Sequence, residues 1–222
     1  MIRVFAAVLV RDLRIALRRL PETLLSAVFF VLALSLFPLG VGASPEVLAR
    51  IGAGVIWVLA LFAVTVSLDR LFQGDFEDGS MELLVLAPVP LEVVVVAKCT
   101  AHWLASGLLL VLVSPLLAVL MGLPPEALWV LPASLLLGTP TLTLVGAVGA
   151  ALLLGSRRGG ATTALLVLPL DIPVLIFGVS AVDGYLLGLG GSAQFLILGA
   201  LLLLALAATP FATAAALRLA YE

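Results

Sequence analysis

Residues 99–125 read CTAHWLASGLLLVLVSPLLAVLMGLPP and contain no Asp, Glu, Lys or Arg. A helix of about 20 mostly apolar residues crosses the hydrocarbon core of a bilayer, so this stretch is long enough for one span. The apolar run is continuous and lacks the alternation that marks the strands of a membrane barrel. We therefore expect a transmembrane helix near residues 99–121.

The same pattern recurs along the whole chain. Stretches without charge lie between Glu22 and Glu46, Arg50 and Asp69, Lys98 and Glu126, Glu126 and Arg157, and Asp183 and Arg218, and the stretch from Arg158 to Asp183 holds Asp171 alone. Each stretch fits one span. The expected spans lie near 23–43, 51–68, 99–121, 128–154, 161–182 and 195–217. This predicts an all-α membrane protein in which residues 1–222 form one transmembrane domain.

Composition supports this class and excludes others. Of 222 residues, 64% are hydrophobic and 11% are charged, whereas a soluble domain is about 25% charged. A soluble enzyme is therefore excluded. The near balance of 11 Lys and Arg against 13 Asp and Glu provides no basic surface for nucleic acid.

The basic residues predict the orientation. With the N-terminus in the cytoplasm, only Arg50 lies outside, and the other ten basic residues lie inside: Arg3, Arg11, Arg14, Arg18, Arg19, Arg70, Lys98, Arg157, Arg158 and Arg218. This matches the positive-inside rule. We expect the protein in the cytoplasmic (inner) membrane, with both termini in the cytoplasm.

Residues 1–20 have the pattern of an amphipathic helix. At about 100° per residue, one face carries arginines and the other carries apolar residues: Arg3, Arg11, Arg14 and Arg18 against Ile2, Phe5, Leu9, Leu13, Ala16, Leu17 and Leu20. The pattern predicts a helix in the inner membrane interface, with the arginines toward lipid headgroups. A helix packed on a partner is the alternative. Pro21 would begin the first span.

Residues 69–92 form the longest polar segment. Gly79 interrupts the chain, Ser80 is a candidate helix cap, and Glu82 would lie in the first turn of a short helix. The body of that helix is apolar, and Pro88 and Pro90 end it. Because a solvated connector has no need of so many large apolar residues, we expect a docking element on the cytoplasmic side.

The run Glu77-Asp78-Gly79-Ser80-Met81-Glu82-Leu83-Leu84 resembles the cytoplasmic loop of ABC-2-type transporter permeases. Further stretches resemble one family of that superfamily, the haem exporter protein B family of cytochrome c maturation permeases. They are FPLGVG (37–42), RIGAGVIWVLAL (50–61), AKCTAHW (97–103), LLLGTPTL (135–142), RRGG (157–160), LPLDIPVLIFG (168–178) and PFATAAALR (210–218). The resemblance covers nearly the whole chain.

The resemblance implies a permease subunit that acts in haem export or the release of a haem chaperone. It implies coupling to a separate ATP-binding subunit through Glu77, Asp78, Gly79, Ser80, Glu82, Leu83 and Leu84. The implied partners are that ATPase, further membrane subunits of cytochrome c maturation, the haem chaperone and membrane lipid. Haem would be the substrate rather than a cofactor of this chain.

Two negative expectations concern chemistry. A P-loop needs a Gly-Lys-Ser/Thr sequence, and the only lysine, Lys98, stands between Ala97 and Cys99. We therefore expect ATP hydrolysis on the partner and no catalytic residue or metal site here. His102 is a weak candidate for a haem ligand, because a lone histidine at the end of a span is more often structural.

Asp171 is the one acidic residue within an expected span, between Pro169 and Pro173. Such a residue faces the protein interior, a cavity or a partner. The purely structural interpretation is a polar patch in a helix broken by proline. Two alternatives to the permease remain open: an ion-coupled secondary carrier that uses Asp171, and a non-transporting scaffold of the maturation complex.

Overall fold

The computed structural model describes residues 1–42, 44–155 and 159–221, and the side chains of 159–161 are not described. Within these residues every regular element is a helix. The elements are α1 (Ile2–Arg18), α2 (Leu20–Ser35), α3 (Phe37–Val41), α4 (Pro45–Leu68), α5 (Arg70–Glu77), α6 (Ser80–Leu86), α7 (Leu91–His102), η1 (Trp103–Gly107), α8 (Leu108–Leu120), α9 (Ala127–Leu152), α10 (Gly159–Leu186) and α11 (Ser192–Leu219). Arg157 and Arg158, which enter the predicted charge asymmetry, lie outside the described residues.

Six helical stretches among the described residues are long and apolar enough to cross a membrane, which confirms the predicted fold class. They are Leu20–Val41, Pro45–Glu77, Leu91–Leu120, Ala127–Leu152, Thr162–Leu186 and Ser192–Leu219. The third begins at Leu91, eight residues before the expected start, because the helix runs through Lys98 without interruption. A charge within a helix does not end it when the charge finds partners inside the protein.

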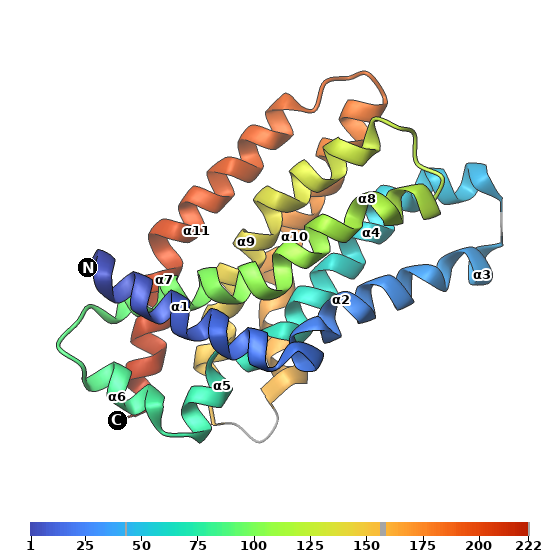
Figure 1. Ribbon diagram of the computed structural model, residues 1–222. Helices are drawn as coiled ribbons and strands as arrows, with labels where there is room; N and C mark the ends of the chain where they lie inside the picture. Colours follow the sequence, from blue (N-terminus) through green and yellow to red (C-terminus); the bar gives the residue numbers. More distant parts are fainter. Residues whose placement is uncertain (43, 156–158, 222) are drawn as a thin grey trace.

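The helices form an elongated bundle with two unlike ends (Figure 1). Both termini lie at the same end as α5 and α6, and the last turns of α3, α8 and α10 lie at the other end. α9 is central and packs against α4, α8, α10 and α11. The position of the two termini relative to the membrane stays a prediction.

The core in the middle of the bundle is built around Trp57 of α4. Its side chain is fully buried, and its indole N–H donates to Ser134 Oγ at 3.1 Å. A Cβ atom at Gly138 of α9 would lie 2.2 Å from Trp57 Cη2, and one at Gly178 of α10 would lie 2.3 Å from Cζ2. Two helices can therefore approach the ring only because each has glycine there, as small residues allow in membrane bundles.

A second apolar cluster lies at the end that carries α5 and α6. Buried residues from α4, α5, α6 and α7 meet there, among them Leu68, Phe72, Met81 and Val94. Gly146 of α9 lets Leu68 approach, since a Cβ there would lie 2.1 Å from Leu68 Cδ1. The polar segment between the second and third spans is therefore packed on the bundle rather than free in solvent.

α1 packs against α7 and crosses it obliquely in Figure 1. Val8 is buried, and Val4 and Phe5 pack against the second apolar cluster. The expectation that Arg11 faces lipid headgroups is wrong, because its guanidinium turns inward and pairs with Asp75. The membrane-surface position of α1 stays a prediction.

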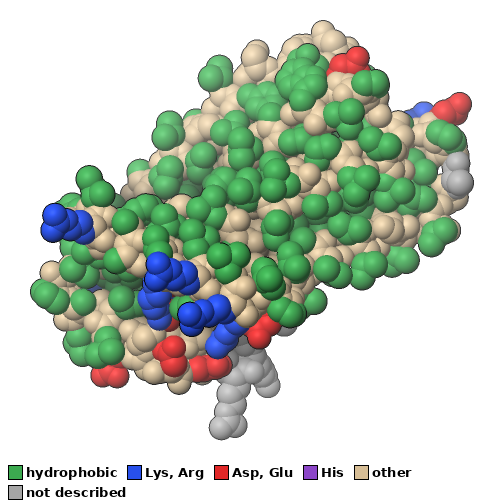
Figure 2. Space-filling model, viewed as in Figure 1, with side chains coloured by type: hydrophobic (Ala, Val, Ile, Leu, Met, Phe, Trp, Pro, Cys, Tyr) green, Lys and Arg blue, Asp and Glu red, His purple; other side chains and the backbone are tan. Residues whose placement is uncertain are grey.

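The outer surface of the bundle matches a lipid environment. Figure 2 shows hydrophobic side chains over the length of the body and charged side chains gathered mainly at the end of α1, α5 and α6. α11, for example, has exposed apolar side chains at Leu196, Leu203, Leu204 and Phe211. Apolar surface of this extent is covered by lipid or by other proteins, and the chain is a multi-pass membrane protein.

Candidate functional site

The predicted coupling segment folds as two short helices, α5 and α6, joined at Asp78 and Gly79. Gly79 adopts φ +77°, a conformation that glycine reaches without strain. The chain can therefore reverse between the helices and lay α6 against the end of α7. The helix at 80–86 was expected, and α5 was not. Its amphipathic pattern was hidden because one of its buried residues is charged, the set being Leu71, Phe72 and Asp75.

The beginning of α6 is capped differently from the expectation. Ser80 is the first helical residue and makes no side-chain cap. Its backbone N–H donates to Asp78 Oδ1 at 2.8 Å, and its hydroxyl donates to Asp75 Oδ1 at 2.8 Å. Hydrogen bonding by Ser80 holds the pKa of Asp78 below its usual value. The predicted position of Glu82 in the first turn is found.

The apolar residues of α6 divide between two faces. Met81 is fully buried, and Leu84 and Val85 are half-buried against the bundle. Leu83 and Leu86 are 71% and 73% exposed. These two lie three residues apart and so share one face of the helix. Glu77, Asp78 and Glu82 are also exposed. Leu83 and Leu86 therefore form an exposed apolar pair with acidic neighbours at this end of the bundle.

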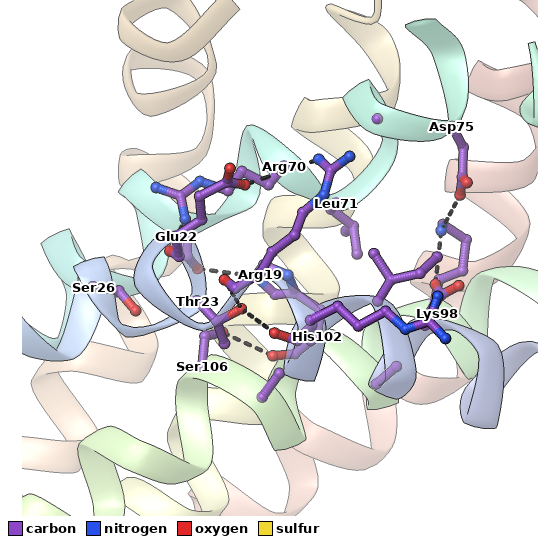
Figure 3. Close-up of a pocket in the computed structure, with 18 of the residues that line it drawn as sticks. Arg19, Glu22, Thr23, Ser26, Arg70, Leu71, Asp75, Lys98, His102 and Ser106 are labelled. Atoms are coloured by element: carbon purple, nitrogen blue, oxygen red, sulfur yellow. Dashed lines mark hydrogen bonds and ion pairs between the residues drawn. The ribbon is translucent and has the colours of Figure 1, made fainter. Parts of the chain in front are cut away.

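Beneath α6 lies a buried ionic network that sequence reasoning missed. Lys98 of α7 is 4% exposed, and its ammonium donates to Asp12 Oδ2 at 2.8 Å and to Asp75 Oδ2. Arg11 of α1 donates to Asp75, to Ser80 Oγ at 3.1 Å and to Asp12 Oδ1 at 3.2 Å. Asp75 accepts hydrogen bonds from three side chains at once. Figure 3 shows Lys98 and Asp75 pointing toward one another.

This network joins four elements. Arg11 and Asp12 come from α1, Asp75 from α5, Ser80 from α6 and Lys98 from α7. Two cations and two carboxylates balance, and the carboxylate of Asp75 raises the pKa of the Arg11 guanidinium. A buried charge persists when it is paired and hydrogen-bonded. A displacement of α5 and α6 therefore acts directly on α1 and on α7. The signal in the sequence was Lys98, the lone lysine beside a long apolar run.

His102 does not join this network or the exposed face of α6. Its Nε2 lies 2.9 Å from Ser67 Oγ of α4. Ser67 donates its one proton to the carbonyl oxygen of Val64 at 2.7 Å, so the imidazole N–H is the donor between the two side chains. This hydrogen bond gives His102 a structural role between α4 and α7. Within the described residues no group of three His, Cys, Asp or Glu side chains is placed to hold a metal ion.

Comparison with known proteins adds the family. The model of the family described as CcmB protein matches residues 3–220. The chain belongs to the CcmB protein family. It is 52% identical to Heme exporter protein B of Pseudomonas aeruginosa, over 99% of this chain and 98% of that protein. It is 45% identical to the protein of the same name from Haemophilus influenzae, over 99% of both chains. The resemblance stated from the motifs is therefore confirmed.

The relatives extend beyond these two. Heme exporter protein B of Rhodobacter capsulatus is 49% identical over 96% of this chain and 97% of that protein. Since these matches run through every helix of this CcmB-family chain, the bundle, α5 and α6 all lie inside the shared region. The predicted coupling residues Glu77 to Leu84 lie together at one end of the bundle. His102 lies on α7 and Asp171 on α10, outside this segment of the chain.

Asp171 lies on the inner face of α10. The residue is 1% exposed, and its Oδ1 has no hydrogen-bond partner among the described residues. The helix is not broken there, since α10 runs from Gly159 to Leu186 with Pro169 and Pro173 inside it. An unsatisfied buried acceptor destabilises a fold by about 1–3 kcal/mol. Its interior position agrees with the rule for intramembrane carboxylates.

Removing this acceptor is expected to stabilise the protein. Asp171→Ala and Asp171→Val differ in volume, so overpacking or a small void cannot mask the effect in both. At least one should raise the midpoint of thermal unfolding in detergent by several degrees, since about 1 kcal/mol corresponds to roughly 2–4 °C in a domain of this size. Leu170→Ala, at the exposed neighbour of Asp171, is the control. A lower midpoint for both Asp171 variants would show that the carboxyl stabilises the bundle.

Proposed function

We propose that this chain is the membrane permease subunit of a haem-export complex of c-type cytochrome maturation. The observation that carries the proposal is the full-length identity of 45–52% to proteins named Heme exporter protein B. It agrees with the six apolar helices. These relatives do not favour the ion-coupled carrier or the non-transporting scaffold. The chain would contribute the membrane path or the moving part, and haem would be cargo rather than a bound cofactor.

We place the end that carries α1, α5 and α6 in the cytoplasm of the inner membrane. Support comes from the basic residues, of which Arg3, Arg11, Arg14, Arg18 and Arg19 lie on or next to α1 at this end. Lys and Arg flank spans on the cytoplasmic side. In this orientation α5 and α6 are accessible to an ATP-hydrolysing subunit in the cytoplasm.

The exposed face of α6 is then the docking surface for a separate ATPase subunit. Leu83 and Leu86 supply apolar contact area, and Glu77, Asp78 and Glu82 supply negative charge around it. Apolar anchors inside a polar rim are typical of protein interfaces. Motion imposed on α6 passes to Asp75 through the Ser80 hydroxyl, and from Asp75 to α1 and α7. Hydrolysis of ATP belongs to the partner, and this chain transmits its work.

A double substitution on the exposed face tests this role. Leu83→Gln/Leu86→Gln should reduce co-purification of the ATPase subunit at least about tenfold, since two interface anchors each contribute over 1 kcal/mol. Thermal stability of the purified chain should stay within about 0.5 kcal/mol, because both side chains are exposed. Accumulation of c-type cytochromes should fall with the ATPase.

The matched control is Leu187→Gln/Leu189→Gln, which alters two exposed leucines in the turn after α10 at the opposite end. This variant should retain the ATPase and cytochrome maturation. If the α6 variant retains the ATPase as well as the control does, α6 is not the docking surface.

A further inference from the structure

A cavity of about 460 Å³ opens beside the ionic network, and the proposed function does not use it. It lies at the elbow between α1 and α2, and residues of α4, α5, α7 and η1 complete its wall (Figure 3). Two hydrogen bonds hold the elbow, from the Thr23 hydroxyl to the carbonyl oxygens of Ala16 at 3.0 Å and of Arg19 at 3.1 Å. The volume falls within the range of small-molecule sites.

Among the described residues, one buried polar side chain of the wall has no partner. Ser26 of α2 is 4% exposed, lines the cavity, and its Oγ makes no hydrogen bond within the described residues. The other hydroxyls of the wall are used: Ser67 lies against His102, and Ser106 donates to the His102 carbonyl oxygen at 2.8 Å. A buried hydroxyl without a partner is uncommon in native proteins. It therefore marks a position where a bound group would accept a hydrogen bond.

The wall itself carries four cationic and four acidic side chains and is neutral, and the excess of one positive charge comes from Arg11, which pairs with Asp75 beside the cavity without lining it. Within the ionic network the positive charges of Lys98 and Arg11 are balanced by the carboxylates of Asp12 and Asp75. Arg19 lies 3.9 Å from the carboxylate of Glu22. This leaves two guanidinium groups and one carboxylate: Arg18, Arg70 and Asp78. Arg70 donates only to the backbone oxygen of Glu22. The two arginines are thus available to a ligand with negative charge.

The surface next to the cavity is apolar. On α2, Glu22, Thr23 and Ser26 line the cavity, whereas Leu24, Leu25, Val28, Phe29 and Leu32 are exposed on the outside of the same helix. A ligand seated at Ser26 would therefore find polar partners at one end and an apolar helix face at the other. The wall on the far side includes Ala105 and Ser106 of the π-helical turn η1, and such turns occur often at functional sites.

We propose that this cavity binds the phosphate headgroup of an anionic phospholipid, whose acyl chains lie along the exposed apolar face of α2. Arg18 and Arg70 pair with the phosphate, and the Ser26 hydroxyl donates to it. Basic pockets between membrane helices bind lipid headgroups in this manner. The lipid would fill the elbow between the surface helix and the first span, next to the network that carries Asp75 and Lys98.

The test uses the purified full chain in nanodiscs of phosphatidylcholine with graded fractions of phosphatidylglycerol. The readouts are the thermal midpoint and the lipid retained in native mass spectrometry. For the unaltered chain the midpoint should rise with phosphatidylglycerol and saturate. Arg70→Gln and Arg18→Gln should each weaken the apparent affinity about fivefold, as expected for one basic residue at a lipid headgroup. Ser26→Ala should weaken it about tenfold and leave the midpoint in pure phosphatidylcholine unchanged, because Ser26 has no internal partner to lose.

Two controls separate this site from its alternatives. Arg3→Gln removes an exposed charge from α1 outside the cavity and should leave the apparent affinity unchanged. An equal loss in Arg3→Gln and Arg70→Gln would overturn the proposal in favour of general surface attraction. Soluble glycerol phosphate and inorganic phosphate should not reproduce the stabilisation. If either protects as well as phosphatidylglycerol, the site takes free phosphate and the lipid assignment is wrong.

Discussion

Lys98→Met is expected to destabilise the protein by about 3–5 kcal/mol and to abolish its contribution to c-type cytochrome maturation. Methionine keeps the length of the side chain but removes the ammonium that both Asp12 and Asp75 accept from. The buried carboxylate of Asp75 and the partly buried one of Asp12 would then share the single cation Arg11. Removing one partner of a buried ion pair has a cost of this size because the remaining charge is left uncompensated. The measurement is unfolding of the purified chain in one detergent.

The control for this prediction is an exposed ion pair in the same chain. Arg218→Met breaks the pair between Arg218 and Glu92, whose nitrogen and oxygen lie 3.0 Å apart. That pair is solvated, so the change should stay below about 1 kcal/mol. A double variant, Lys98→Met/Asp75→Asn, restores the charge balance and should be less destabilised than the sum of the single variants. Equal stability of the Lys98 and Arg218 variants would show that the network does not hold the four elements together.

Gly178→Ala and Gly138→Ala are each expected to destabilise the bundle by about 1–3 kcal/mol, and together to prevent its assembly. A Cβ at Gly178 would lie within 2.6 Å of three atoms of the Trp57 ring, and one at Gly138 would lie 2.2 Å from the ring. The ring cannot retreat, because it is enclosed on both sides and its N–H is held by Ser134. The two methyl groups would press on the same ring from two helices, so the combined cost should exceed the sum of the two single costs.

Gly54→Ala is the matched control, since it lies on the same helix as Trp57 and nothing lies within 4 Å of its added Cβ. Its thermal midpoint should equal or exceed that of the unaltered chain, because alanine has the higher helix propensity. Trp57→Leu makes room for the new methyl group, so Gly178→Ala should cost less in that background than in the unaltered chain. If Gly178→Ala is equally destabilising in the Trp57→Leu background, the methyl group does not clash with the Trp57 ring.

Much of this protein could be read from spacing along the chain. The six stretches with no charge or a single charge predicted six membrane helices, because a segment of that length and hydropathy has one stable structure in lipid. Gly79, Glu82 and the leucines that follow predicted the short helix α6, since glycine conformation, helix charge and apolar periodicity are local properties. The family resemblance came from motifs in order along the chain and needed no contacts.

Tertiary contacts decided the rest. Arg11 was assigned to the lipid surface with Arg3, Arg14 and Arg18, because its position on a helical wheel is the same, but Asp75 from a segment 64 residues away draws it inward. In the sequence Lys98 bears only on topology and on the missing P-loop, whereas in the bundle it lies between Asp12 and Asp75. The unpartnered Ser26 at the cavity is invisible in sequence for the same reason. Helix formation and membrane insertion depend on the local order of residues. Ion pairs and cavities depend on which helices pack together, because their side chains come from segments that are distant in the sequence.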